Sequence, residues 1–382
     1  MTSNQDLPHL QPHSDPGFEI GWDYAHHRLV PPAEQLLPAN PVRLGWEAGQ
    51  AVFGVRTLRA TPQVRKWLRL RLNAWMRGKA FELVQVTPHF LARIDVAHCP
   101  VTGEALTHGS GGDSDASVDR VNNRAGYAAG NLAVMSVRAN RAKSDLDWRD
   151  AAGIVRRIEA GQLGQIDGLN AREWARLAAL MSCCTPLSHA EAASMPLLVL
   201  PPPRLRLLNP VQAVQAGLTI AFATPGRTPR LDALLRLFPA SVHHEVRSFV
   251  TTLLARRIAA GPAATRTELG AAFEAAWSEP LLLRRWQRLA LRMDAAACEA
   301  VAAALPAVVA GGTAEARRAA PLSYLGFEQA TEGWALATGG MAEPRIEGVD
   351  QGPVAGVLSP PRGGSLLPKR RPPTQVDRSL IL

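Results

Sequence analysis

The sequence predicts a mainly α-helical fold with one small α+β element in its N-terminal half. Hydrophobic residues make up 47% of the 382 residues but aromatic residues only 5%, and the alanine- and leucine-rich balance favours helices over sheets. Apolar residues recur at helical spacing in several separate segments. One stretch, 117–145, instead joins two strand-like runs through an Asn- and Gly-rich turn, which predicts a local ββα unit.

The N-terminal segments show no periodic pattern. Residues 1–17 are polar, with scattered Pro and His, and are predicted to be disordered. Residues 18–54 contain two Gly-Trp pairs and a Pro-Pro pair, and we expect them to form an irregular, packed lead-in. The first folded module is predicted to cover 18–160, with helices flanking the ββα unit.

Three helices are expected in this module. The first covers 62–79, where Pro62 suits the beginning of a helix and Gly78 suits its end. The second covers 87–96, and the third covers 147–161 and ends on a glycine. Strand, loop, strand and helix are expected to lie between the second and the third.

The C-terminal half is predicted to be helical throughout. Residues 161–210 form a helical connector, in which the proline-rich segment 195–210 is extended. Residues 211–339 carry apolar residues at helical spacing and predict an all-α domain of unknown role. Residues 340–382 are rich in Pro, Gly and Arg and predict a flexible tail.

The charge balance favours a polyanionic partner. The formal net charge is +9 and the sequence pI is about 10.1, which suits nucleic acid; arginine-rich codon usage is an alternative explanation. Between residues 56 and 79 there are eight basic residues and no acidic one. This run predicts either a phosphate-facing helix or an ordinary solvated helix face.

Cysteine usage and the N-terminus favour a cytoplasmic protein. The four cysteines are too few and too scattered for a disulfide framework, which suits a reducing compartment. The N-terminus lacks the basic and apolar regions of a signal peptide. The longest apolar run, at 195–203, is too short to span a bilayer, so no membrane association is expected. The oligomeric state is left open.

The polar residues of the ββα unit form the candidate site. Asp119 and Arg120 end the first strand-like run, Asn131 lies in the turn, and Asn140 and Lys143 lie on the following helix. A ββα unit can bring the Asp119, Asn131 and Asn140 side chains toward one point. A carboxylate and two amides at one point suit a hard divalent cation.

This stretch resembles the HNH endonuclease family, the His-Me finger nucleases with a ββα-metal core. It also resembles phage-type members that carry Asp-Arg in place of Asp-His. The resemblance covers roughly residues 95–148. It implies a metal-dependent endonuclease that hydrolyses phosphodiester bonds, with Asp119 and Asn140 as ligands of Mg²⁺ or Mn²⁺ and Asn131 supporting the loop. The expected substrate is double-stranded DNA, in a phage-related or genome-defence setting.

Basic residues around the unit are predicted to bind the nucleic acid backbone. The resemblance places Lys143 where a phosphate-contacting lysine often lies, and Arg120 can clamp a phosphate. The full set of predicted nucleic-acid-binding residues is Arg120, Arg138, Arg141, Lys143, Arg69 and Arg71.

Arg120 stands where the family has its general base. A guanidinium stays protonated at working pH and cannot take a proton from water. His98 and His108 are the candidate replacement bases, because imidazole titrates in the useful range; His89 is a weaker candidate. Each of them is alternatively an ordinary surface or packed histidine.

Two further functions stay open. One is a non-catalytic nucleic-acid-binding protein on a degenerate HNH scaffold, and the other is a helical interaction protein whose ββα unit is purely structural. Structural zinc is not expected, because Thr102 stands where a Cys-x-x-Cys motif beginning at Cys99 would have its second cysteine. Cys99 is therefore predicted to be a small buried hydrophobic residue.

Overall fold

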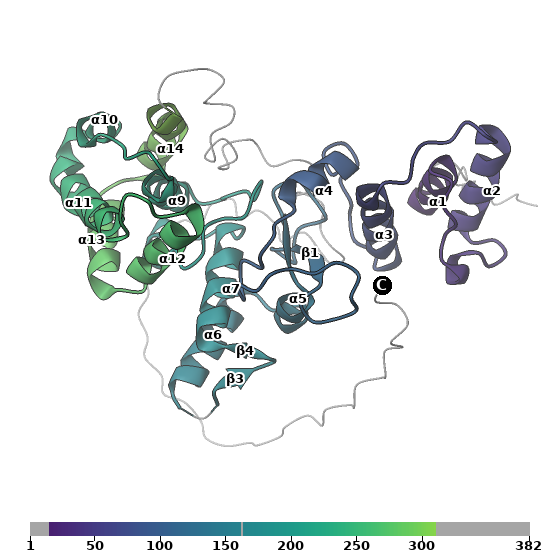
Figure 1. Ribbon diagram of the computed structural model, residues 1–382, viewed down its shortest axis with the longest axis horizontal. Coiled ribbons are helices and arrows are strands. Elements are labelled where there is room, and N and C mark those ends of the chain that lie inside the picture. The colour runs from purple at the N-terminus through teal and green to yellow at the C-terminus, as the bar shows by residue number, and fades with distance from the viewer. Residues whose placement is uncertain (1–14, 162, 311–382) are drawn as a thin grey trace, which may run out of the picture.

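A computed structural model describes residues 15–161 and 163–310 of the chain. The chain is mainly helical, with a small two-stranded sheet in the predicted α+β element, and its described residues also contain a second pair of strands of two residues each. In Figure 1 helices α1 and α2 lie at one end of the long axis, the small sheet lies in the middle, and helices α9 to α14 lie at the other end. The predicted tail at 340–382 and most of the predicted disordered segment lie outside the described residues.

The lead-in segment is a pair of packed helices, so the prediction of an irregular segment over 18–54 is wrong. Helix α1 is Pro16–His26 and helix α2 is Pro41–Phe53; α1 thus begins inside the segment predicted to be disordered. Each helix starts with a proline after a side-chain cap, from Asp15 to Gly17 N (2.7 Å) and from Asn40 to Val42 N (2.9 Å). These caps satisfy orphan N–H groups at the helix starts.

Two glycines let α1 and α2 approach closely. A Cβ atom on Gly21 would lie 1.9 Å from the carbonyl oxygen of Val42, and one on Gly45 would lie 1.9 Å from that of Phe18. At these two points the hairpin packs backbone against backbone, and Ile20 and Val42 belong to one small apolar core beside them.

The next two predicted helices are confirmed. Helix α3 is Pro62–Met76 and helix α4 is Pro88–Ile94. The side chains of Thr61 and Thr87 cap them, each accepting a hydrogen bond of 3.2 Å from the N–H three residues on. Gly78 has a φ of +59°, which glycine adopts without strain just beyond a helix end.

The strand–loop–strand–helix order of the site segment is also confirmed. Strand β1 is Ala116–Arg120, strand β2 is Leu132–Ser136, and helix α5 is Val137–Lys143. The strands are antiparallel, with Asp119 opposite Ala133. The unit therefore has the ββα shape that the sequence predicts.

The remaining described elements are mostly helices that pack on one another. A capping box begins α6, where Asp147 and Asp150 exchange side-chain and backbone hydrogen bonds. The proline-rich segment before α9 is free of helix and passes the ββα unit, where Arg206 N donates to Gly130 O at 2.8 Å. These elements are α6 (Trp148–Glu159), β3 (Gln165–Ile166), β4 (Leu169–Asn170), α7 (Ala171–Cys183), α8 (His189–Ser194), α9 (Pro210–Ala223), α10 (Leu231–Leu235), α11 (His243–Ala259), α12 (Arg266–Trp277), α13 (Pro280–Ala290) and α14 (Ala295–Ala310), with short 3₁₀ turns at Ala33–Gln35 and Ala240–Val242.

Strand β2 lies between two hydrophobic cores. Ala133 and Met135 belong to a large core that continues through α7 and the C-terminal helices, across the boundaries predicted at 160 and 210. Leu132 and Val134 point the other way, into a smaller core with α3 and α4. Because side chains alternate along a strand, β2 is buried on both faces. The ββα unit is thus held in position from two sides.

Candidate nucleic-acid interface

Asn131 holds together the loop that joins the two strands. Its side chain is 0% exposed. Oδ1 accepts a hydrogen bond from Asn122 N (2.8 Å), while Nδ2 donates to Asn122 O (3.0 Å) and to Gly126 O (2.9 Å). Every one of these partners is a backbone group of the same loop. The contacts are those of the predicted loop-supporting residue.

Lys143 lies inside the unit, so its prediction as a phosphate-binding residue is wrong. Its side chain is 0% exposed. Nζ donates to Arg120 O at 2.9 Å and to Asn123 Oδ1 at 3.0 Å, and it lies 3.0 Å from Asp119 Oδ2. An ammonium that is buried among three oxygen neighbours is not accessible to a phosphate in solution.

Asp119 is a buried carboxylate whose neighbouring cation is the Lys143 ammonium. The residue is 9% exposed, and Oδ2 is at ion-pair distance from Nζ without the alignment of a hydrogen bond. Burial raises the pKa of Asp119 above the ordinary carboxyl value, and the Lys143 charge opposes that rise only in part. Asp119 therefore faces the interior of the unit.

The Arg120 side chain is hydrogen-bonded to the loop that joins β1 and β2. Its Nη1 donates to the carbonyl oxygens of Asn123 (3.0 Å) and Ala125 (2.9 Å), and its guanidinium lies 5.2 Å from the ring centroid of Tyr127. The residue at the position of the general base thus braces the loop that Asn131 also holds.

Asn140, the second predicted metal ligand, donates from Nδ2 to Ser117 Oγ at 2.8 Å. Ser117 precedes Asp119 by two residues and shares its face of β1. The described residues contain no group of three or more His, Cys, Asp or Glu side chains able to hold a metal ion. With the Asp119 carboxylate facing Lys143, Asp119 and Asn140 do not fit a divalent cation.

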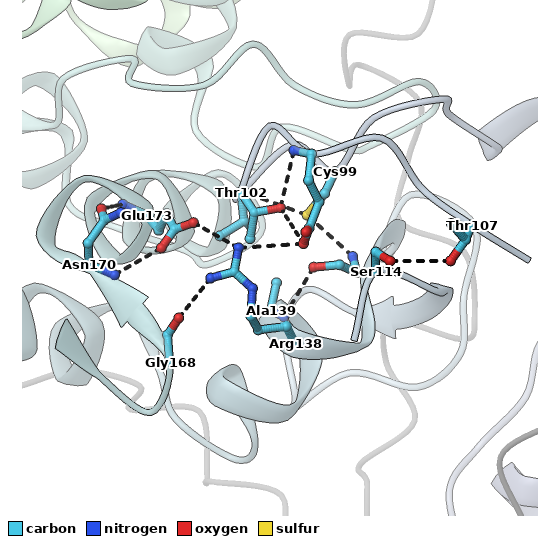
Figure 2. A network of polar contacts seen from close by, with 12 residues as sticks. Cys99, Thr102, Thr107, Ser114, Arg138, Ala139, Gly168, Asn170 and Glu173 are labelled. Carbon is cyan, nitrogen blue, oxygen red and sulfur yellow. Dashed lines mark hydrogen bonds and ion pairs between the residues drawn. The ribbon is translucent and has the colours of Figure 1, made fainter. Parts of the chain in front are cut away.

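Two predicted nucleic-acid-binding arginines are engaged within the fold. In Figure 2 the Arg138 side chain extends toward Gly168 and Glu173: it donates to Gly168 O at 2.7 Å and pairs with Glu173 (3.1 Å) and Glu104 (3.5 Å). It thereby joins α5 to the β3–β4 turn and to α7. Arg141 is exposed but pairs with Asp113 at 3.0 Å.

Cys99 is buried, as predicted, and it closes a tight turn beside Arg138. Its Sγ accepts hydrogen bonds from Thr102 N at 3.4 Å and from Ser136 N at 3.3 Å; Figure 2 labels Cys99 and Thr102. The turn therefore links the segment before β1 to the start of α5. Thr102 itself donates to Glu104 Oε1 at 2.9 Å, so the residue at the second cysteine position is engaged locally.

The two predicted arginines of α3 lie on different sides of the helix. Arg71 is 4% exposed, stacks on Trp67 and pairs with Asp23 and Glu19, so its assignment as a nucleic-acid-binding residue is wrong. Arg69 is exposed. Residues two apart on a helix point in nearly opposite directions, so these two side chains cannot face one partner.

A groove lies between α3 and β1, with a volume of about 490 Å³. On the α3 side it is lined by Arg65, Lys66 and Arg69, and Arg65 and Arg69 are exposed one turn apart. Arg65 belongs to the basic run that predicts a phosphate-facing helix, but the predicted set of nucleic-acid-binding residues did not include it, although its four-residue spacing from Arg69 could have revealed it. The other lining residues are Pro62, Gln63, Leu70, Asn73, Leu91, Asp95, His108, Gly109, Asp115, Ala116, Ser117, Val118 and Val137.

The two candidate replacement bases lie in different pockets. His108 lines the groove between α3 and β1, whereas His98 lines a separate pocket with the Pro201–Pro203 segment. Asp119 lines neither pocket. The structure therefore does not bring these histidines and Asp119 together in one cavity.

Asp115 organises the loop that forms the far wall of the groove. Its carboxylate accepts hydrogen bonds from Thr107 Oγ1 (2.6 Å), Ser110 Oγ (2.8 Å) and N (3.1 Å), and Gly111 N (2.7 Å). These donors lower the pKa of Asp115 to about 2. The Asp115 carboxylate therefore points toward its own loop.

The Asp115 contacts predict a pH dependence of the loop. Because the folded pKa of Asp115 is about 2 and its ordinary value is 3.8, its stabilising contribution is complete above the ordinary pKa and is lost as the pH falls toward about 2. We expect the protection of the Ser110 and Gly111 amides against hydrogen exchange, corrected for the intrinsic exchange rate at each pH, to fall over this range. In Asp115→Asn the exchange should be raised at neutral pH, and equal protection in both proteins would contradict the assignment.

Comparisons with known proteins place the chain in no family. No family model, curated protein or solved structure matches it. Within residues 15–161 and 163–310 no helix has both the length and the apolar character needed to cross a membrane.

Proposed function

We propose that this chain binds the backbone of double-stranded DNA in the groove between α3 and β1, on an HNH-like ββα scaffold, without hydrolysing it. The observation that carries the proposal is the pair Arg65 and Arg69. Both side chains are exposed, both line the groove, and neither forms an ion pair within the described part of the chain. Uncompensated guanidinium groups one turn apart suit successive phosphates.

The other residues that line the groove are compatible with binding of a duplex backbone. Its two carboxylates are engaged locally, since Asp95 pairs with Lys66 at 3.7 Å and the ionised Asp115 accepts hydrogen bonds from its own loop. None of the described lining residues is Phe, Tyr or Trp. Single strands are held largely by stacking on such rings, so this lining favours a duplex backbone.

Binding without hydrolysis is favoured by the residues at the nuclease positions. The Asp119 carboxylate is buried against Lys143, and Arg120 is bonded to loop carbonyls. Hydrolysis on this scaffold needs an accessible carboxylate for the metal and a group that accepts a proton from water. Neither residue offers that chemistry in this arrangement.

The test is a charge reversal in the groove. Fluorescence anisotropy with a labelled 20-base-pair duplex should show at least tenfold weaker binding for Arg65→Glu/Arg69→Glu than for the wild type. The slope of log K against log salt should fall by about 2, because each lost phosphate contact contributes about 0.9.

A matched control uses Arg284→Glu/Arg288→Glu on α13, an exposed pair with the same spacing and the same charge change. We expect the control to lose less than about threefold, as a long-range charge effect is screened by salt. Equal losses in both variants would indicate nonspecific attraction to a basic chain. Mg²⁺- or Mn²⁺-dependent plasmid nicking that disappears in Asp119→Ala would favour the nuclease.

A further inference from the structure

The Lys143 ammonium is enclosed by oxygen atoms of three different kinds. They are a carboxylate oxygen of Asp119 (3.0 Å), the carbonyl oxygen of Arg120 (2.9 Å) and the amide oxygen of Asn123 (3.0 Å). Carboxylate, carbonyl and amide oxygens are also the ligands that proteins offer to hard metal ions. The position therefore has the donor set of a cation site, with an ammonium in it.

The distances distinguish an ammonium from a metal ion. Separations of 2.9–3.0 Å are those of charge-assisted N–H···O contacts, whereas Mg²⁺ takes oxygens at about 2.0–2.1 Å and Ca²⁺ at about 2.3–2.6 Å. Two of the three oxygens accept hydrogen bonds from the ammonium, and the Asp119 oxygen pairs with it through charge. The cage is complete without another ion.

The orientation of the Asn123 amide is independent support. Its Nδ2 donates to the carbonyl oxygens of Ser144 (3.0 Å) and Leu146 (3.4 Å), so its oxygen must point the other way, toward Lys143. The carbonyl oxygens just beyond α5 thus orient the Asn123 amide so that its oxygen accepts from the Lys143 ammonium, which α5 itself supplies.

We propose that Lys143 is the built-in cation of the ββα unit. Its ammonium takes the place of a divalent ion beside Asp119, so the unit is stable without metal. The same geometry makes a second assignment: when the side chain is shortened, the oxygen cage becomes a binding site for a small primary ammonium ion. Neither statement depends on DNA binding, because both concern the folded unit alone.

The test is chemical rescue of Lys143→Ala in the full-length protein, followed by thermal unfolding. The variant should melt about 10 °C below the wild type, because the Asp119 carboxylate is left buried without its partner. n-Propylammonium replaces the four atoms that the substitution removes. At about 100 mM it should restore roughly half of the lost melting temperature by binding the folded state.

Three controls define the ligand chemistry. 1-Propanol has a similar shape without charge and should restore less than a quarter as much. Lys143→Met refills the volume and should show no rescue by n-propylammonium. Lys66→Ala removes a half-buried lysine that is 3.7 Å from Asp95, and it should neither melt more than about 2 °C lower nor respond to n-propylammonium.

Measurements on the wild type with and without a divalent ion decide between the proposal and a metal site. Its melting temperature should be the same in EDTA and in 5 mM Mn²⁺, and calorimetric titration with Mn²⁺ should give no saturable heat. A saturable Mn²⁺ site lost in Asp119→Asn would overturn the proposal, even if Lys143→Ala failed to fold. Equal rescue by 1-propanol, or no rescue of a folded Lys143→Ala, would overturn it as well.

Discussion

Replacing Asn131 with alanine is expected to lower the free energy of unfolding by about 3 kcal/mol, because three backbone groups, one buried and two partly buried, each lose a hydrogen bond at roughly 1 kcal/mol or more apiece. These groups are Asn122 N, Asn122 O and Gly126 O, all in the loop between β1 and β2. The measurement is urea unfolding with the midpoint and slope fitted separately, so that a change in the denatured state is recognised.

Asn140→Ala is the matched control for this prediction. Asn140 is also an asparagine of the ββα unit, but it is half-buried and makes a single side-chain hydrogen bond, to Ser117. The expected loss is about 1 kcal/mol. If the two variants were equally stable, Asn131 would not be the main support of the loop.

Replacing Gly21 with alanine is expected to separate helices α1 and α2. The added Cβ would lie 1.9 Å from Val42 O and 2.8 Å from Trp46 N, both backbone atoms that cannot rotate away. The cost should reach about 3 kcal/mol, the upper part of the usual range for overpacking. Limited trypsin digestion within residues 27–58 should then be faster than in the wild type.

Gly153→Ala is expected to change the free energy of unfolding in the opposite direction. Gly153 lies inside α6, and an added Cβ would meet only Arg156 Nη2, at 3.8 Å. Alanine should stabilise this helix by up to about 1 kcal/mol through its higher helix propensity. A Gly21→Ala protein as stable as Gly153→Ala would show that α1 and α2 do not pack through Gly21.

The parts of the fold that follow from local signals could be predicted from the sequence. Helices α3, α4 and α6 begin at a Pro or a polar cap and carry apolar residues at helical spacing, and the ββα order follows from two apolar runs around an Asn- and Gly-rich turn. The α1–α2 hairpin could not be predicted in this way. Its packing depends on Gly21 and Gly45, whose role is close backbone approach rather than burial of an apolar face.

The candidate site was less predictable, because side-chain direction and burial depend on the whole fold. Lys143 lies in the last turn of a short helix, where exposure is the usual expectation, yet α5 packs against β1 and turns its ammonium inward. Arg69 and Arg71 share the same basic run, and only the helix geometry separates them. Positions of His98 and His108 depend on loops, for which the sequence holds no spacing rule.

The most direct measurement is duplex affinity of the wild type in EDTA and in 5 mM Mg²⁺ or Mn²⁺, at constant ionic strength. Because Arg65 and Arg69 bind the phosphates and Lys143 stabilises the unit without metal, the Kd of the wild type for the duplex should agree within about twofold in all three buffers, once salt is matched. Binding or strand cleavage that appears only with the divalent ion, and that is lost in Asp119→Asn, would contradict this account.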